Sequence, residues 1–372
     1  MIGDLNSGLM AAKIGPLVAS GWVKRITFLS QFAGPPEDKV DYLVVPDAPG
    51  FCRRTFRRMR AAFSAMRRRP DLIVAYNVNP FGYLAWLLSR LYGVPYGVGV
   101  ISGPLEISGG GVQIENRLLA RFPFLAPVNE RMALFALRRA LFVTTTGNAT
   151  RDYLIGRGIP KARVYVLPSV VDPARFHPRD NPRDIDVVCL TNLIARKRVD
   201  RLFEIAKALR PKYPGLKMEI VGDGPLQAEL KDRVRAMGLE SCIGFAGWQG
   251  DVRPFLWRAR IFALTSVTEG LPLALIEAMG CGVPGVVGRV GDVEDIVIEG
   301  KNGCLVPEGD VEAYTEAIDA LLADPARRDR LAVAAGETVA SGYTVAAGVR
   351  TWARIHADWI APEARFKTAT GP

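Results

Sequence analysis

Histidine and paired cysteines are scarce in this chain. It has only two histidines, His177 and His356, which leaves little material for histidine-based metal sites or for serine and cysteine catalytic triads. Its five cysteines include no C-x-x-C pair, and most lie within apolar runs, where a free thiol packs as a small hydrophobic group. The cysteines therefore indicate a reducing compartment.

Long hydrophobic runs are also missing. No apolar stretch reaches the roughly 18 residues that a membrane-spanning helix needs. Asp4 and Asn6 interrupt the basic-then-apolar order of a signal peptide at once. We therefore expect a cytoplasmic protein.

Acidic residues are few in the N-terminal half. Residues 1–180 hold 24 lysines and arginines against 12 aspartates and glutamates, whereas residues 181–372 hold 24 against 26. The formal net charge of +10 therefore arises from the first half. Such asymmetry predicts that one domain faces a polyanion or an anionic membrane while the other has a different task.

The rest of the sequence alternates short apolar runs with longer amphipathic ones, as βα units on a parallel sheet do. Two series of such units are separated by a proline-rich polar segment near residues 172–184. We expect an N-terminal domain over residues 1–172 and a C-terminal domain over residues 173–344. The amphipathic sequence within residues 345–372 is a candidate to pack on the N-terminal domain. Only Met1 to Gly3 precede the first loop-like segment, so we expect either that the first strand is missing or that the sequence starts too late to include it.

Two loops of the second series directly follow predicted strands. One strand ends at Val221 and runs into Gly222-Asp-Gly-Pro225, where glycines let the backbone approach a ligand, although an ordinary turn has the same composition. Another strand ends at Leu190 and is followed by the basic triplet Arg196-Lys197-Arg198 near a helix N-terminus. That triplet is suited to hold a diphosphate; the alternative is a solvated basic turn.

The most specific motif extends from Thr265 to Gly280. Glu269 lies in a loop after a predicted strand, and Glu277 lies two turns further on in an otherwise apolar helix. A carboxylate in such surroundings is costly unless it has a partner. Carboxylates so placed accept hydrogen bonds from sugar and ribose hydroxyls, and the loop between them offers backbone N–H groups at Gly270, Leu271 and Leu273.

These motifs resemble a known family. Glu269 and Glu277 match the Glu, seven residues, Glu signature of the retaining group 1 (family 4) glycosyltransferases. Four further motifs resemble that family in order and spacing: Pro168-Ser-Val-Val-Asp172, Val221-Gly-Asp-Gly-Pro225, Gly280-Cys-Gly-Val-Pro284 and Asn302-Gly303. The resemblance implies the GT-B fold, an α/β architecture of two Rossmann-like parallel-sheet domains facing a cleft.

The resemblance also implies roles for individual residues. Lys197 is expected at the donor diphosphate, Glu277 at the ribose and Glu269 at the transferred sugar, so Lys197 and Glu269 are the catalytic candidates. The other donor-binding candidates are Asn192, Arg196, Gly222, Gly224, Gly270, Leu271 and Leu273. Ser7, Gly8 and Ser102 are the candidates for an acceptor or phosphate loop. The family's reaction uses a nucleotide-sugar substrate and needs no metal or other cofactor.

Some positions depart from the family pattern. Asn192 stands where the family usually has an arginine that pairs with the diphosphate, and Arg196 is the candidate to replace its charge. Ser102 stands in place of a common histidine, and Gly291-Asp292 in place of a Gly-Gly pair. Asp184-Ile-Asp186 resembles a metal-binding motif, but it precedes a strand at the far edge of the sheet and is interpreted as structural.

An arginine-rich helix is expected over residues 51–69, which contain eight arginines and no acid. Its apolar residues form one helical stripe, and such a stripe usually packs on the protein's own sheet. Packing does not explain the arginines, which predict attachment to an anionic membrane. Those assigned to that contact are Arg53, Arg54, Arg57, Arg58, Arg67, Arg68 and Arg69. Arg117, Arg121, Phe122 and Phe124 are candidates to extend that surface or to bind the acceptor.

The sequence therefore predicts a retaining glycosyltransferase acting on a polysaccharide or lipid-linked glycan. One alternative is a catalytically degenerate member of the family. Another is a nucleic-acid-binding protein, but the arginines alternate with core-type residues rather than with stacking aromatics, so no nucleic-acid partner is expected.

Overall fold

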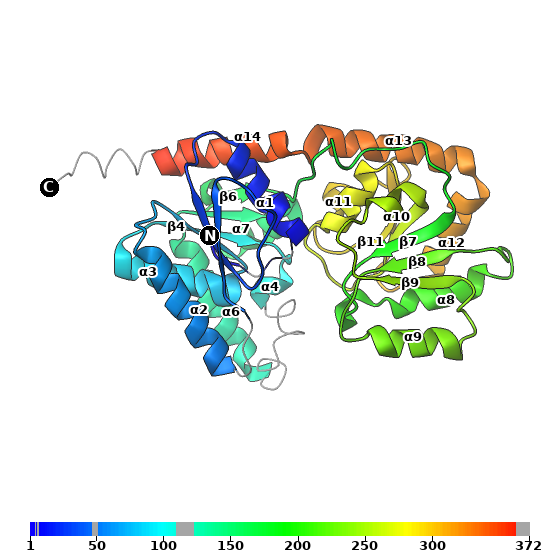
Figure 1. Cartoon of the computed structure of the whole chain (residues 1–372), viewed down its shortest axis with the longest axis horizontal. Helices are drawn as coiled ribbons and strands as arrows, with labels where there is room; N and C mark the ends of the chain where they lie inside the picture. Colours follow the sequence, from blue (N-terminus) through cyan, green and yellow to red (C-terminus); the bar gives the residue numbers. More distant parts are fainter. Residues whose placement is uncertain (4, 6, 47–50, 109–122, 362–372) are drawn as a thin grey trace. The chain divides into compact units, whose positions relative to one another are not determined.

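The structure, a computed structural model, describes the 372-residue chain except residues 4, 6, 47–50, 109–122 and 362–372 (Figure 1). The chain divides into two compact units: Met1–Val170 with Val345–Pro372, and Val171–Thr344. Each is built on parallel strands, so the α/β class expected from the sequence is confirmed. In the part of the chain that is described, no helix is both long and apolar enough to cross a membrane.

The second unit contains a six-stranded parallel sheet with the order β12-β11-β10-β7-β8-β9. The chain winds outward from β7 to β9, returns to the other side of β7, and winds outward again from β10 to β12. The strand order therefore reverses between β7 and β10, where open α/β sheets form a ligand crevice at the carboxyl ends of the strands. The strands are β7 (Ile185–Leu190), β8 (Met218–Val221), β9 (Ile243–Gly247), β10 (Ala259–Leu264), β11 (Gly285–Gly288) and β12 (Gly303–Val306).

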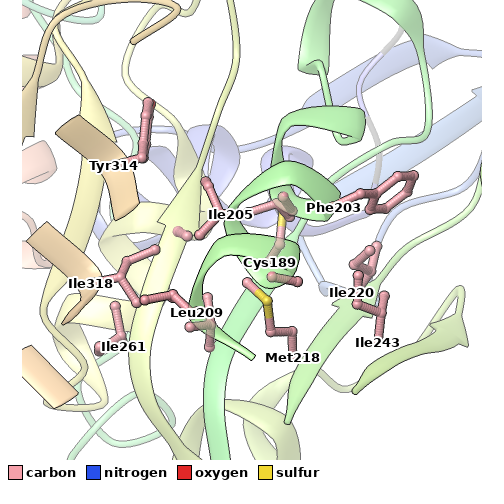
Figure 2. Packing of buried hydrophobic residues seen from close by; sticks show 14 of the residues in the cluster. Cys189, Phe203, Ile205, Leu209, Met218, Ile220, Ile243, Ile261, Tyr314 and Ile318 are labelled. Carbon is pink, nitrogen blue, oxygen red and sulfur yellow. The ribbon is translucent and has the colours of Figure 1, made fainter. Parts of the chain in front are cut away.

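Apolar cores cover both faces of this sheet, because both faces of its strands carry apolar side chains. Figure 2 shows Ile205 and Leu209 of α8 close to Cys189, Met218 and Ile261 of the strands. The opposite face packs against α10, α11 and α13. The helices are α8 (Asp200–Leu209), α9 (Gln227–Ala236), α10 (Arg253–Arg258), α11 (Leu273–Gly280), α12 (Val311–Ala323) and α13 (Pro325–Gly342).

In the first unit, the chain's first residues join two groups of strands. β3, β4, β5 and β6 pair in sequence order, and β1 pairs with β2. Ile2 bridges Leu29 on one side and Ala75 on the other. Its N–H donates to Val74 O at 2.9 Å, and its carbonyl accepts the N–H of Tyr76 at 2.9 Å. The strands are β1 (Ile26–Ser30), β2 (Val40–Val44), β3 (Ile73–Tyr76), β4 (Tyr96–Val100), β5 (Phe142–Thr145) and β6 (Val164–Val166).

The residues around Ile2 take the place where a first strand was expected to be missing. The segment around Ile2 is too short for a full strand, yet its backbone hydrogen bonds to both neighbours hold the sheet together. The amino group of Met1 donates to Thr27 O at 2.6 Å. Burial lowers the pKa of this group to about 5, because an ammonium is poorly solvated there.

The last helix of the chain completes the first unit. α14 (Val345–Ile355) packs against α1 (Ser7–Ala19), with Trp352 and Ile355 fully buried. A Cβ at Gly348 would lie 2.5 Å from Cγ of Pro16, so glycine is needed for this close approach. The other helices of the unit include α2 (Phe51–Met66), α3 (Tyr83–Tyr92), α4 (Leu105–Ser108), α6 (Ala126–Arg139) and α7 (Asn148–Gly156).

Candidate functional site

A basic turn follows β7 at the reversal of strand order. Ala195–Lys197 form a short 3-10 turn, and Arg198 after it has a left-handed backbone with φ 45°. The turn is tied to the loop that follows β10: Val267 N–H donates to Arg196 O at 2.9 Å, and Thr265 Oγ1 donates to Arg198 O at 2.9 Å. The carboxyl ends of the two central strands are thereby held together.

The two candidate catalytic side chains meet in this arrangement. Lys197 Nζ donates to Glu269 Oε1 at 2.5 Å, and Arg196 Nη1 lies 4.0 Å from Glu269 Oε2. Glu269 is only 6% exposed. Burial opposes ionisation of its carboxyl, but the charges of Lys197 and Arg196 prevail and lower its pKa. Two cations thus share one carboxylate, and the excess positive charge favours an anion here.

The start of α11 adds hydrogen-bond donors beside Glu269. The helix begins at Leu273 after Pro272, and no side chain in the described part of the chain caps it. Within the described residues, the N–H groups of Gly270, Leu271 and Leu273 donate to no acceptor in the protein. Unpaired N–H groups at a helix N-terminus attract anions, since the helix dipole is positive there. The loop therefore offers both charge and directed donors.

Gly222 and Gly224 have a structural reason to be glycine. Gly222 has φ 140°, and a Cβ there would lie 1.9 Å from Thr191 O. A Cβ at Gly224 would lie 2.6 Å from Leu193 O. The glycines let the loop after β8 pack on the loop after β7, which carries Asn192 at the surface. A contact of either glycine with a ligand stays a prediction.

Gly291 supports the loop of Glu269 in a similar way. With φ 59°, its missing Cβ would lie 1.9 Å from Glu269 O, and the N–H of the next residue, Asp292, donates to Gly270 O at 3.0 Å. The departure from the family's Gly-Gly pair thus falls at a backbone contact with this loop.

Glu277 lies in the second half of α11, and its carboxylate accepts no hydrogen bond within the described chain. Burial raises its pKa to about 8; Arg175 opposes that shift, and Asp251 adds to it. The side chain nevertheless keeps partial solvent exposure. A carboxyl in this state is available to a hydroxyl-bearing ligand.

Ser7, Gly8 and Ser102 lie in the first unit. Ser7 and Gly8 open α1 and are exposed. The N–H of Ser102 donates to the buried carboxylate of Glu106 at 3.0 Å. Asn6, Arg117, Arg121 and Phe122 lie outside the described residues.

Two polar residues near Ser102 were not singled out by sequence. Glu106 also accepts the N–H of Val78 at 2.6 Å and of Ile101 at 2.9 Å, so one carboxylate fixes the loops after β3 and β4. Asn77, which follows β3, has φ 71°, and its buried Oδ1 has no hydrogen-bond partner among the described residues. Backbone strain and unpaired buried polar atoms are concentrated at functional sites. Neither residue lies in a motif that spacing could reveal.

Asp184 and Asp186 form structural ion pairs. Asp184 pairs with Arg258 at 2.6 Å, and Asp186 pairs with Arg260 while accepting the N–H of Lys217. Both lie at the amino end of β7, away from Lys197. Among the residues that are described, no group of three His, Cys, Asp or Glu side chains could hold a metal ion.

Two family models match the chain. The model described as "Glycosyl transferase 4-like domain" matches residues 16–169, and "Glycosyl transferases group 1" matches residues 171–338. The chain belongs to the group 1 glycosyl transferases. The family expected from the spacing of Glu269 and Glu277 is therefore confirmed.

Relatives of this group 1 protein include cell-envelope enzymes. The GDP-mannose-dependent alpha-(1-6)-phosphatidylinositol monomannoside mannosyltransferase of Mycolicibacterium smegmatis is 34% identical, over 55% of this chain and 59% of the relative. The lipopolysaccharide core biosynthesis glycosyltransferase LpsE of Rhizobium meliloti is 32% identical, over 47% of this chain and 49% of the relative. The chain thus spans less than two thirds of the length of these curated relatives.

Solved structures share the fold of this group 1 protein. The crystal structure of Anabaena HepE in complex with UDP-glucose matches with a TM-score of 0.77 and 18% identity, over 95% of this chain and 97% of that one. This likeness confirms the expected GT-B fold of two Rossmann-like domains.

Proposed function

We propose that this protein is a retaining glycosyltransferase that moves a sugar from a nucleotide-sugar donor to a polysaccharide or lipid-linked glycan acceptor. The observation that carries the proposal is the sharing of Glu269 by Lys197 and Arg196 beside the uncapped start of α11. Further support comes from two of the similar proteins. The mannosyltransferase of Mycolicibacterium smegmatis is named as GDP-mannose-dependent, and the structure of Anabaena HepE was solved in complex with UDP-glucose.

In this proposal, the cluster stabilises the leaving group. When the bond between the anomeric carbon and the diphosphate breaks, negative charge grows on the phosphate oxygens. Lys197, Arg196 and the N–H groups of Gly270 to Leu273 neutralise that charge through fixed positions, a form of electrostatic catalysis that requires no metal ion. Glu269 accepts hydrogen bonds from hydroxyls of the transferred sugar, and Glu277 accepts hydrogen bonds from hydroxyls of the ribose. Gly222 and Gly224 let the backbone approach the donor.

Thermal-shift screening against UDP, GDP and ADP sugars tests the donor half of the proposal, because a ligand that binds the folded state raises its melting temperature. Lys197→Ala should abolish the shift. The matched control is Lys207→Ala, which removes an exposed lysine from α8 and should keep it. If no nucleotide sugar stabilises the wild type, the proposal fails.

A second candidate is a degenerate family member that binds a donor without transferring the sugar. It is favoured by the exposed Asn192 at the usual arginine position and by Ser102 at the usual histidine position. Transfer and donor-hydrolysis assays with the donor found by thermal shift separate the two candidates. Proton NMR of the product anomer then tests retention.

We further propose that the arginines on and after α2 attach the protein to an anionic membrane. Arg53, Arg57, Arg67 and Arg69 are exposed. Each contributes about 1 kcal/mol near an anionic bilayer at most. Two others are partly engaged: Arg58 lies over the Phe81 ring at 5.6 Å, and Arg68 pairs with Asp41 at 2.8 Å.

The packing of α2 leaves room for that contact. Ala62 and Met66 are buried, as expected of a helix on its own sheet, but Phe56 in the same stripe is 67% exposed. Binding to vesicles should weaken as salt increases, and indifference to anionic lipid content would contradict the proposal. A salt-sensitive gel shift of RNA or DNA would instead favour nucleic acid.

A further inference from the structure

Asn77 is held in a backbone conformation that asparagine rarely adopts. Its φ of 71° and ψ of 136° lie outside the left-handed helical region that asparagine tolerates, in a part of conformational space that glycine enters freely. The Asn77 N–H donates to Gly99 O at 3.0 Å, and the Asn77 carbonyl accepts the N–H of Gly82 at 3.1 Å. These two hydrogen bonds hold the strained conformation in place.

The side chain of Asn77 adds a second cost to the fold. Its Oδ1 is buried and has no hydrogen-bond partner among the described residues. A buried polar atom without a partner destabilises the folded state, and so does a non-glycine residue with this backbone. Glycine at this position would remove both costs. An amide that lowers stability twice is typical of a residue that serves binding rather than folding.

Asn77 follows the strand at which the order of strands in the first unit reverses. The chain winds from the segment around Ile2 outward to β1 and β2, and then returns to β3 on the other side of Ile2. Open α/β sheets bind ligands at the carboxyl ends of their strands at such a reversal. In the second unit, Glu269 has the corresponding place in the loop after β10. The topology therefore puts Asn77 where the first unit is built to bind a ligand.

Ser102 is tied to the loop of Asn77 by a shared carboxylate. Glu106 is 1% exposed, and its Oε1 accepts the N–H of Val78, the residue after Asn77, at 2.6 Å. Its Oε2 accepts the N–H of Ser102 at 3.0 Å. Ser102 is half-buried, and its hydroxyl makes no hydrogen bond within the described chain. An unpaired amide and an unpaired hydroxyl are thus fixed at the ends of the neighbouring strands β3 and β4.

We propose that Asn77 and Ser102 bind the acceptor, and that the part of the acceptor they hold is an uncharged polyol ring. Amide and hydroxyl groups both donate to and accept from sugar hydroxyls. Neither side chain carries the positive charge that favours a phosphate or a carboxylate, and Glu106 supplies none. The role as an acceptor site rests on the proposed transferase function, whereas the binding of an uncharged ring can be measured without it.

Saturation-transfer NMR on the full chain, without donor, tests the inference. The probes are the methyl glycosides of glucose, mannose and galactose, those of the matching uronic acids, and myo-inositol. At least one uncharged ring should bind, and each uronic acid should bind more weakly than its uncharged counterpart. Asn77→Gly and Ser102→Ala should each weaken binding of the uncharged ring on the order of tenfold, because a hydrogen bond to the ligand is lost.

Stability separates a role in binding from a role in folding. Asn77→Gly removes both the strain and the unpaired amide, so its urea midpoint should rise above that of the wild type while ring binding falls. This gain outweighs the extra freedom that glycine gives to the unfolded chain. Asn181→Gly is the matched control: Asn181 is exposed and has no positive φ, so the same change should leave ring binding unchanged without raising the midpoint.

Four results would overturn the inference. No uncharged ring binds, a uronic acid binds at least as tightly as its uncharged counterpart, Asn77→Gly keeps full affinity, or its urea midpoint falls, which would show that the residue serves the fold. The thermal-shift screen with nucleotide sugars is scored separately. If an uncharged ring binds through Asn77 while no nucleotide sugar stabilises the protein, the transferase function fails and the ring site stands.

Discussion

We expect Arg196 to supply the positive charge that Asn192 lacks, if the donor diphosphate binds beside Lys197. Its guanidinium lies 4.0 Å from Glu269, while its carbonyl accepts the N–H of Val267. A side-chain change therefore leaves the turn anchored. Arg196→Ala should weaken donor binding by about ten- to hundredfold, since a charge-assisted hydrogen bond contributes roughly 1.5–3 kcal/mol. Isothermal titration calorimetry with the donor that gives the largest thermal shift measures this affinity. The Arg196→Lys variant keeps the positive charge and should retain most of the affinity. Full affinity in the Arg196→Ala variant would refute the role of Arg196 in binding the diphosphate.

Glu277 makes stability depend on pH. Its pKa is about 8 in the folded protein, against an ordinary value of 4.5, because burial disfavours the carboxylate. Between these values the folded state holds a proton that the unfolded state has lost. The free energy of unfolding should therefore fall as pH rises through this window, by up to about 1.4 kcal/mol per pH unit. Urea unfolding at several pH values should show this slope in the wild type and a shallower one in Glu277→Gln; equal slopes would contradict the assignment.

The loop between β8 and α9 depends on glycine for two separable reasons. At Gly222, in this loop, both the φ of 140° and the 1.9 Å that would separate an added Cβ from Thr191 O exclude a side chain. Gly238, which follows α9, has a φ of 64° but open space around it and serves as the comparison. Gly238→Ala should cost about 1 kcal/mol, from backbone strain alone. Gly222→Ala should cost more than about 3 kcal/mol, because it also displaces the loop after β7. Denaturant midpoints compare the two variants, and equal losses would show that steric contact at Gly222 is unimportant.

Elements were predictable from the sequence where apolar runs are uninterrupted. β7 was expected and found at Ile185–Leu190, whereas β9 (Ile243–Gly247) contains two glycines and β6 has three residues, so neither gave a clear signal. Lys197 and Glu269 were each expected in a loop after a strand, and parallel strands end at one edge of the sheet. Their direct contact was found only in the structure. The contacts of Glu106 could not be predicted, because they join backbone amides of two separate loops and leave no spacing pattern.

At the scale of the whole molecule, the chain leaves the first unit at Val170 and returns to it at Val345. The first unit is therefore completed by α14, whose Trp352 is 1% exposed and packs edge-on against Phe142 at 5.7 Å. Trp352→Ala should destabilise this unit by about 3–5 kcal/mol through the cavity it leaves. The residues proposed to bind the donor all lie in the second unit, whereas the acceptor-side candidates Ser7, Gly8 and Ser102 lie in the first.

Calorimetry distinguishes the stability of the first unit from donor binding by the second unit. In Trp352→Ala, the transition of the first unit should fall by roughly 10 °C, while a bound nucleotide sugar should still raise the transition of the second unit as it does in the wild type. Phe32→Ala, which removes an exposed aromatic side chain of the first unit, is the control and should move neither transition. If both transitions fall together in Trp352→Ala, or if the donor no longer stabilises the second unit, the two units unfold as one and the donor site depends on both.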